Sequence, residues 1–225
     1  MRETNYKFHV VEHFISINGE GTKAGQLSAF VRLQGCNLNC SYCDTKWANE
    51  ANALFTSMTA KEIAEWVVTS GVENVTLTGG EPLLHKNVRM LLEELVERNL
   101  FVEIETNGSV SLEDFIHISD KITFTMDYKL PSSHMEHTMC LSNFSLLEEK
   151  DTIKFVVGTM KDLQRAKDVI DQYKLTKKCH IYLSPVFNHI EPKTIVEFMI
   201  NHHMNGVNLQ LQLHKFIWEP NKKGV

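Results

Sequence analysis

The sequence predicts an α/β fold in which alternating strands and helices form a partial, open TIM-like barrel. Short runs rich in apolar and β-forming residues alternate with amphipathic stretches, a pattern typical of a parallel sheet with right-handed crossovers. At 225 residues the chain is short for a complete eight-unit barrel, which typically needs about 250 residues. Its conspicuous motifs follow predicted strands, and such folds place their chemistry at the carboxyl ends of strands.

Seven segments are predicted to be strands because apolar, β-branched and aromatic residues dominate them. The first is residues 28–33 (SAFVRL), followed by residues 74–78 (NVTLT) and 101–105 (FVEIE). The others are residues 122–126 (ITFTM), 152–157 (TIKFVV), 180–183 (HIYL) and 207–213 (VNLQLQL).

Helices are predicted between these strands. A Thr-Ala-Lys-Glu capping box begins the first helix at Thr59, ahead of an apolar face. Residues 88–96 (VRMLLEELV) form the second, and Pro192 suits the first position of the fourth. Helical spacing identifies the third from Leu163, Ala166, Ile170 and Tyr173.

Composition excludes several classes of protein. The net charge of −5 gives no general attraction to nucleic acid or to anionic membranes, so we expect neither as a partner. The first residues lack the apolar region of a signal peptide, and no stretch reaches the roughly 18–20 apolar residues that span a bilayer. With no linker or repeat in view, we expect a single domain over residues 1–225 in the cytoplasm.

Three of the five cysteines, Cys36, Cys40 and Cys43, lie within eight residues. An odd, crowded set is a poor disulfide framework and has the spacing of metal ligands in a reducing compartment. Cys140 and Cys179 stand alone, and we interpret both as structural cysteines.

Thiolates suit either zinc or an iron–sulfur centre. Structural zinc normally takes four ligands, and one of the eleven histidines could supply the fourth. A [4Fe–4S] cluster usually takes four cysteines, so three would leave one iron open to a small molecule. The spacing favours iron–sulfur, with zinc as the alternative.

The spacing Cys-x3-Cys-x2-Cys in the loop of residues 35–45, with Tyr42 before the last cysteine, resembles the signature of the radical S-adenosylmethionine (SAM) superfamily. Gly79-Gly80-Glu81-Pro82 resembles that superfamily's GGEP motif. The resemblance implies a partial barrel whose [4Fe–4S] cluster is held by Cys36, Cys40 and Cys43. It also implies that the open iron chelates SAM, which is cleaved to methionine and a 5′-deoxyadenosyl radical.

Further segments resemble the 7-carboxy-7-deazaguanine synthase family of queuosine biosynthesis, from about Phe14 to Pro220. They are residues 16–21 (SINGEG), 30–36 (FVRLQGC), 43–45 (CDT), 105–108 (ETNG), 127–129 (DYK) and 212–215 (QLHK). This resemblance implies conversion of 6-carboxy-5,6,7,8-tetrahydropterin to 7-carboxy-7-deazaguanine with loss of ammonia. SAM is then used catalytically, Mg²⁺ is required, an electron donor such as flavodoxin or ferredoxin is the partner, and the enzyme is a homodimer.

The resemblance also implies roles for substrate-binding residues. Arg32 matches an arginine that binds the substrate carboxylate, for which its planar fork is suited, although an arginine on a surface strand is the simpler alternative. Asn18 stands where most members are expected to have Gln, and is one methylene shorter. The residues that match substrate contacts are Ile17, Asn18, Gly19, Arg32, Thr78, His214 and Pro220.

Cofactor contacts are implied in the same way. Thr45 matches the single protein ligand of Mg²⁺, an ion that keeps several waters, although without the family it would read as turn chemistry. Asp127 and Tyr128 stand where many members have Ser and Pro. The residues that match SAM contacts are Tyr42, Cys43, Asp44, Gly80, Asp127, Tyr128, Lys129, Ser184, Pro185, Val186 and Phe187.

Two other functions use the same cysteines. A radical SAM activase would make a glycyl radical on a partner protein, and would need neither residues 16–21 nor the C-terminal His-Lys. A zinc-binding structural module would use the thiolates without redox chemistry.

Overall fold

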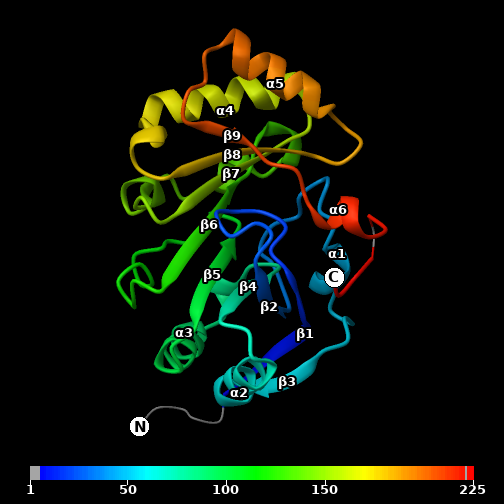
Figure 1. Cartoon of the computed structure of the whole chain (residues 1–225), viewed down its shortest axis with the longest axis vertical. Coiled ribbons are helices and arrows are strands. Elements are labelled where there is room, and N and C mark those ends of the chain that lie inside the picture. The colour runs from blue at the N-terminus through cyan, green and yellow to red at the C-terminus, as the bar shows by residue number, and fades with distance from the viewer. Residues whose placement is uncertain (1–5, 221) are drawn as a thin grey trace.

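The computed structural model describes residues 6–220 and 222–225, which form one nine-stranded sheet in the order β3-β1-β2-β4-β5-β6-β7-β8-β9 (Figure 1). Neighbouring strands from β2 to β9 pair in parallel, whereas β1 pairs antiparallel with both β2 and β3. The sheet has free edges at β3 and β9, so the predicted open barrel is confirmed. The strands are β1 (Lys7–Ile17), β2 (Leu27–Leu33), β3 (Thr56–Thr59), β4 (Asn74–Gly79), β5 (Phe101–Thr106), β6 (Ile122–Tyr128), β7 (Thr152–Val157), β8 (His180–Pro185) and β9 (Val207–Leu209).

Helices surround the sheet at its periphery (Figure 1). No helix in the described part of the chain is both long and apolar enough to cross a bilayer. The α-helices are α1 (Lys46–Asn49), α2 (Ala60–Ser70), α3 (Val88–Glu97), α4 (Met160–Tyr173), α5 (Pro192–Asn201) and α6 (His214–Ile217). The 3-10 turns are η1 (Pro82–Leu84), η2 (Pro131–Ser133), η3 (Glu136–Thr138), η4 (Leu141–Ser145) and η5 (Leu175–Lys177).

Local sequence signals explain where the longer helices begin. At α2 the Thr59 hydroxyl accepts the Glu62 backbone N–H, and the Glu62 carboxylate accepts that of Thr59, which confirms the predicted capping box. Thr159 and Asp162 form a second box at α4. Pro192 occupies the start of α5 as predicted, since its missing N–H would have no partner there.

Two predictions about strands were wrong. The strand expected over residues 207–213 ends at Leu209, because the following residues leave the sheet and Leu213 donates its N–H to the Gly19 carbonyl at 3.3 Å. Asp127 and Tyr128 were expected after a strand but lie within β6, which continues to Tyr128. Of the unit predicted over residues 1–225, residues 1–5 and 221 lie outside the described residues.

The two faces of the sheet differ in chemistry because side chains alternate along each strand. One face is apolar and forms the core with the helices; Leu77, Ile104, Phe124, Phe155 and Leu183 are wholly or almost wholly buried there. Parallel strands covered on both faces usually read as continuous apolar runs. Here polar residues alternate with them instead, and we call the face they share the polar face: Arg32, Thr76, Thr78, Glu103, Glu105, Thr125, Asp127, Lys154, Tyr182 and Ser184.

Candidate active site

The cysteine loop, residues 35–45, follows β2 at its carboxyl end. Cys40 is buried, whereas Cys36 and Cys43 are half-buried, and all three are free thiols. Gly35 has a φ of +96°, a left-handed conformation that lets the chain turn out of the strand into the loop. Leu38 donates its N–H to Cys36 Sγ at 3.4 Å, and Cys43 donates its N–H to the Cys40 carbonyl at 3.3 Å. The predicted ligands therefore occupy one ordered loop.

Neighbouring turns hold this loop in place. Ser41 donates its hydroxyl to the Ser132 carbonyl at 2.6 Å, and Glu81 donates its N–H to the Gly35 carbonyl at 2.8 Å. Gly80 packs so closely that an added Cβ would lie 2.2 Å from the Gly35 oxygen, so a larger residue would displace the loop. The double glycine thus brings the end of β4 against the cysteines.

Glu81 joins three of the motifs and was not assigned a role from the sequence. Its fully buried carboxylate accepts the Asn107 N–H at 2.6 Å, the Leu83 N–H at 3.0 Å and the Thr106 hydroxyl at 3.0 Å. Asn107 in turn donates its amide to Cys36 Sγ at 3.5 Å. Burial raises the pKa of Glu81, although these hydrogen bonds oppose the rise. These hydrogen bonds, from Glu81 through Asn107 to Cys36, therefore link the ends of β4 and β5 to the cysteine loop.

Three free thiols within one loop suit a [4Fe–4S] cluster. Among residues 6–220 and 222–225, no three His, Cys, Asp or Glu side chains converge on one point where a single ion could bind. A cluster instead takes its thiolates on separate irons. Burial raises the pKa of Cys40 and Cys43, and the nearby Lys129 charge opposes that rise. Burial would lower the pKa of Lys129, but Asp127 and Cys40 raise it, so a cation stands beside the thiols.

Arg32 and Thr78, both predicted to bind substrate, lie side by side on the polar face. Arg32 Nη1 lies 3.5 Å from Thr78 Oγ1 and 3.4 Å from the Gly79 carbonyl. Its Nε donates to Glu12 Oε1 at 2.7 Å across the β1–β2 pair. With 17% of its side chain exposed, Arg32 is not the surface strand arginine of the simpler alternative.

The segment predicted to line the pterin, residues 17–19, begins at the last residue of β1. Asn18 is buried, with its side-chain amide engaged by protein groups. Gly19 faces His214, whose Nδ1 would lie 3.0 Å from a Cβ at that position. Glu20, next in sequence, accepts from Lys154 Nζ at 2.9 Å and from the Ser184 hydroxyl at 3.0 Å. The structure thus brings this segment to the polar face and to the C-terminal stretch.

Asp44 and Thr45 lie at the end of the cysteine loop, and their side chains are joined by a hydrogen bond. Thr45 Oγ1 donates to Asp44 Oδ1 at 2.7 Å, which leaves the lone pairs of the threonine oxygen available. Burial acts to raise the pKa of Asp44, but the Thr45 hydroxyl and the positive charges of Lys215, Arg32 and Lys154 outweigh it and lower the pKa. These four residues therefore lie within electrostatic reach of one carboxylate.

Two predicted SAM contacts carry buried polar atoms that have no hydrogen-bond partner among the described residues. They are the Tyr42 hydroxyl and Asp127 Oδ1; the other oxygen of Asp127 accepts from Lys129 Nζ at 2.9 Å. Buried polar groups are usually paired, so these atoms are suited to a bound molecule.

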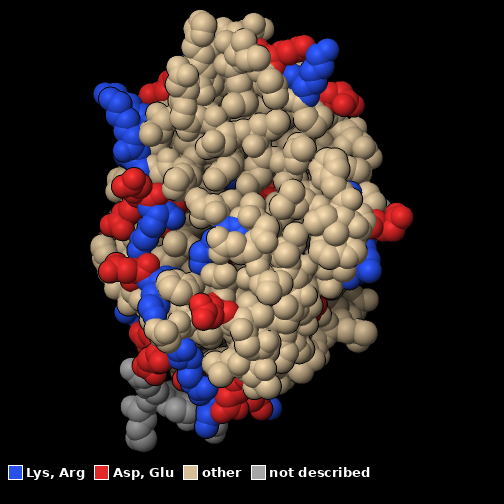
Figure 2. Space-filling view, viewed as in Figure 1, with Lys and Arg blue, Asp and Glu red and all other residues tan. Residues whose placement is uncertain are grey.

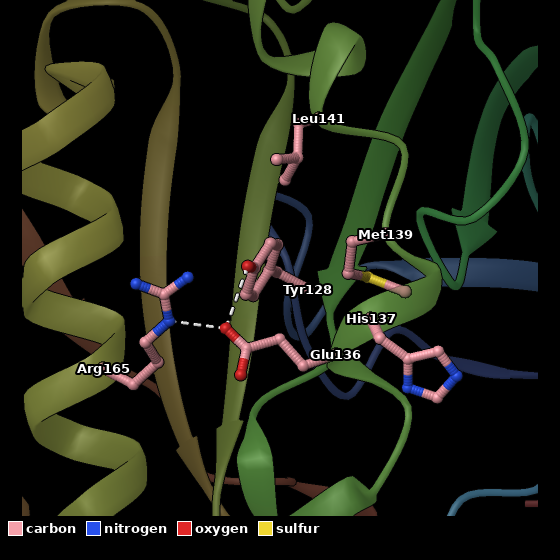
Figure 3. A pocket seen from close by; sticks show the side chains of 6 residues that line it. All are labelled: Tyr128, Glu136, His137, Met139, Leu141 and Arg165. Carbon is pink, nitrogen blue, oxygen red and sulfur yellow. Dashed lines mark hydrogen bonds and ion pairs between the residues drawn. The ribbon is translucent and has the colours of Figure 1, made fainter.

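The side chain of Tyr128 points away from the polar face, to the apolar side of the sheet. Its hydroxyl donates to Glu136 Oε1 at 3.2 Å, and Arg165 pairs with the same oxygen (Figure 3). These side chains line an open hollow of about 510 Å³ together with His137, Met139 and Leu141. The Tyr128 ring stacks on Phe144 on the apolar side of the sheet, so only its backbone is placed to meet a ligand on the polar face.

The second predicted SAM stretch, residues 184–187, lies at the end of β8 beside the C-terminal segment. Ser184 is buried against Glu20, Val186 is buried, and Pro185 is half-buried. Lys215 lies over the Phe187 ring, with Nζ 5.0 Å from its centroid. Further on, half-buried Pro220 precedes Lys223, whose Nζ lies 3.8 Å from the Trp47 ring next to the cysteine loop.

Figure 2 shows charged side chains mainly along the two sides of the face seen in Figure 1, with only a few charged atoms visible among uncharged ones near the middle. Lys154 is among the buried charges. Burial would lower the pKa of Lys154, but Glu20, Asp127 and Glu105 raise it. Sequence reasoning missed Lys154 and Glu103; the signal that could have found them is the polar alternation in strands of a parallel sheet.

Comparisons with known proteins agree with this geometry. The family model described as the Radical SAM superfamily matches residues 30–128. Curated proteins named 7-carboxy-7-deazaguanine synthase are similar over almost the whole chain. That of Clostridium acetobutylicum is 59% identical, covering 98% of this chain and 100% of its own. That of Chlorobaculum tepidum is 37% identical, covering 99% of each.

Solved structures share the fold. The crystal structure of QueE from Escherichia coli superposes with a TM-score of 0.73 at 22% identity, covering 92% of this chain and 94% of that one. Streptococcus suis SuiB bound to S-adenosylmethionine gives a TM-score of 0.56 at 16% identity, and covers 79% of this chain and 45% of that one. At such identities the likeness concerns the fold alone.

Proposed function

Because the chain belongs to the 7-carboxy-7-deazaguanine synthase family of radical SAM enzymes, we propose that its polar face binds 6-carboxy-5,6,7,8-tetrahydropterin and that the enzyme converts it to 7-carboxy-7-deazaguanine with loss of ammonia, in queuosine biosynthesis. The observation that carries this proposal is the single site formed by a three-cysteine loop and the Arg32–Thr78 pair at adjacent strand ends. Neither alternative function accounts for both halves of that site.

Cys36, Cys40 and Cys43 would hold the [4Fe–4S] cluster. When bound, the cluster and SAM supply the radical that removes a hydrogen atom from the substrate. The protein's contribution is position: Glu81 and Asn107 fix the loop, and Gly80 lets the end of β4 approach it closely. The unpaired polar atoms of Tyr42 and Asp127 support their role in SAM binding. The other proposed SAM contacts are Cys43, Asp44, Gly80, Tyr128 through its backbone, Lys129, Ser184, Pro185, Val186 and Phe187.

Arg32 would bind the substrate carboxylate, with Thr78 beside it. Its guanidinium is fixed at Nε by Glu12, which reduces the entropy lost when a ligand binds. His214 and Gly19, which face each other, would form the opposite wall with Ile17 and Asn18. Burial lowers the pKa of His214, which favours the neutral ring at physiological pH. Pro220 completes the proposed substrate contacts.

We propose that Mg²⁺ binds at Thr45. The hydroxyl group of Thr45 donates its hydrogen bond to Asp44, so the lone pairs of the hydroxyl oxygen remain available to the metal. Waters and substrate oxygens would complete the coordination. The proposed setting is the cytoplasm, where thiols stay reduced. We further propose a single domain, an electron donor such as flavodoxin or ferredoxin, and a homodimer, in keeping with the family.

Anaerobic incubation tests the proposed function. The reconstituted enzyme is mixed with SAM, dithionite and 6-carboxy-5,6,7,8-tetrahydropterin, and the products are analysed by mass spectrometry. We expect a product with the mass of 7-carboxy-7-deazaguanine, together with released ammonia. An enzyme that cleaves SAM but leaves the pterin unchanged would contradict the proposal and favour an activase. A colourless protein with one zinc per chain would favour the structural module.

A further inference from the structure

Glu103 lies on β5 beneath the proposed substrate segment and is 5% exposed. Each of its carboxylate oxygens is held by one donor: Oε1 accepts from Thr125 Oγ1 at 2.5 Å, and Oε2 accepts from Asn18 Nδ2 at 2.6 Å. Burial raises its pKa, and these two hydrogen bonds oppose the rise. Burying a carboxylate costs little free energy only when its hydrogen bonds are made. Glu103 therefore holds the side chains of Thr125 and Asn18 in the positions where both bonds form.

Asn18 is held from its other side as well. Its Oδ1 accepts from Thr76 Oγ1 at 2.9 Å, and Thr76 is in turn 2.8 Å from Ser28 Oγ. The amide therefore spans a gap of fixed width between β4 and β5, with its oxygen and one of its two N–H groups engaged. Only 3% of Asn18 is exposed, so its side chain is engaged mainly by the protein.

The position of Asn18 determines that of its neighbours. Its N–H donates to the Gln26 carbonyl and its carbonyl accepts from Gly25, each at 2.8 Å, which closes the turn between β1 and β2. Gly19, next in sequence, faces His214. Gly21 has a φ of +75°, and a Cβ there would lie 2.6 Å from Glu103 Oε1, so the turn packs directly on this carboxylate.

We infer that Glu103 is a positioning residue for substrate binding: by holding the Asn18 amide it sets the place of Ile17 and Gly19, and it requires Asn rather than the longer Gln at position 18. The inference rests on the proposed function, because it takes the pterin as the ligand of that wall. The carboxylate acts through Asn18 and does not itself touch the ligand. The shorter residue at position 18 is thereby explained as one half of a matched pair.

Three variants test the pair: Glu103→Ala, Asn18→Gln and the double variant. Binding of the pterin to the cluster-loaded enzyme with SAM is measured by calorimetry, and KM and kcat are measured alongside. Each single variant should raise the Kd and KM of the pterin by about tenfold or more, since Glu103→Ala loses the hydrogen bond between the buried carboxyl group and Asn18, and Asn18→Gln overfills the gap. The double variant should recover part of that loss, because removal of the carboxylate makes room for Gln. Iron content should stay unchanged in all three, which shows that the cluster loop is intact.

Asp151→Asn is the matched control, since Asp151 is also a buried carboxylate; it lies directly before β7, accepts the Phe124 and Glu148 N–H groups at 2.9 Å, and makes no contact with Asn18 among its hydrogen bonds. It should lower the melting temperature without changing the Kd of the pterin. The inference would be overturned if Asn18→Gln bound the pterin with wild-type affinity, and this outcome is decisive even if Glu103→Ala folds poorly. It would also be overturned if the double variant bound the pterin no more tightly than the weaker of the two single variants. A wild-type enzyme that binds the pterin but makes no product would instead contradict the proposed function.

Discussion

Arg32 is the residue whose surroundings bear most directly on substrate recognition. Arg32→Ala should lower kcat/KM for the pterin about 10- to 100-fold, because a charge-assisted contact of about 1.5–3 kcal/mol is lost. Cleavage of SAM without substrate should be largely retained. Both are measured on protein of equal iron content, with Arg89→Ala as control, since Arg89 forms an exposed pair with Glu93 on α3. Equal loss of both activities would identify Arg32 as structural, acting through Glu12.

The cysteines divide into two groups by their surroundings. Cys36→Ala, Cys40→Ala and Cys43→Ala should each abolish iron incorporation and activity, because a cluster with two protein thiolates is poorly held. Cys140→Ala and Cys179→Ala should do neither. Cys179 lies in the core, where burial raises its pKa to about 12, so it remains a thiol. Iron analysis and visible absorbance after anaerobic reconstitution measure the outcome; retained SAM cleavage in Cys40→Ala would refute the cluster assignment.

Thr45 carries the proposed Mg²⁺ site, and its test is thermodynamic. If the metal is shared between Thr45 and substrate oxygens, Mg²⁺ and the pterin should each raise the other's affinity by the same factor, because coupling between binding equilibria is reciprocal. Thr45→Ala should remove that coupling, and Thr45→Ser, which keeps the hydroxyl, should preserve it. Calorimetric titration of the pterin with and without Mg²⁺ gives the factor. A wild-type affinity that ignores Mg²⁺ would leave Thr45 with only its hydrogen bond to Asp44.

Four of the predicted site residues, Arg32, Thr78, Asp127 and Ser184, lie on the polar face, and the cysteine loop follows the strand that carries Arg32. Glu81 and Glu103 were missed because a carboxylate's role depends on donors distant in sequence: Asn107 is 26 residues from Glu81, and Asn18 is 85 residues from Glu103. Tyr128 shows the opposite case. Its place in a motif says nothing of its side-chain direction, which depends on β6 continuing to its position.

Among the elements, the parallel strands β2 and β4 to β8 were predictable because β-branched and apolar residues dominate them. The first strand, β1, was not predicted although it has 11 residues. Its burial is uneven, so apolar and polar residues do not alternate regularly along it. The short β3 is a four-residue edge strand in which two residues are exposed and two are half-buried. The end of β9 was misjudged because apolar alternation continues past Leu209, where Gln210 already turns to clamp the Gly21 backbone with bonds of 2.7 and 3.1 Å.

The C-terminal segment around α6 is an element whose docking should depend on pH. Burial lowers the folded pKa of His214 below its ordinary value of about 6.5. Its contribution to stability is therefore present above that value and is lost as pH falls through the folded pKa. Melting temperatures from about pH 7.5 to about pH 5 should fall more steeply in wild type than in His214→Gln, which cannot gain this charge. Parallel curves for the two proteins would show that His214 is not the titrating group.

At the scale of the whole molecule, the turn that follows β1 contacts the segment that follows β9, although the two are far apart in the sequence. Gly19 accepts from Leu213, and Gly21 pairs with Gln210, so the turn after β1 meets the segment after β9. Helices lie around the periphery of this open sheet (Figure 1). The proposed site draws on residues from Ile17 to Pro220, and the similarity to the synthase of Clostridium acetobutylicum likewise covers 98% of this chain.

The most direct test of the account is the ratio of 7-carboxy-7-deazaguanine to 5′-deoxyadenosine formed in one anaerobic reaction with SAM, dithionite and the pterin. The resemblance to the synthases implies catalytic use of SAM, so we predict that the pterin product accumulates well beyond 5′-deoxyadenosine. Cys40→Ala, run in parallel, should form neither compound. One 5′-deoxyadenosine for each product would contradict catalytic use of SAM, and 5′-deoxyadenosine without any deazaguanine product would contradict the function itself.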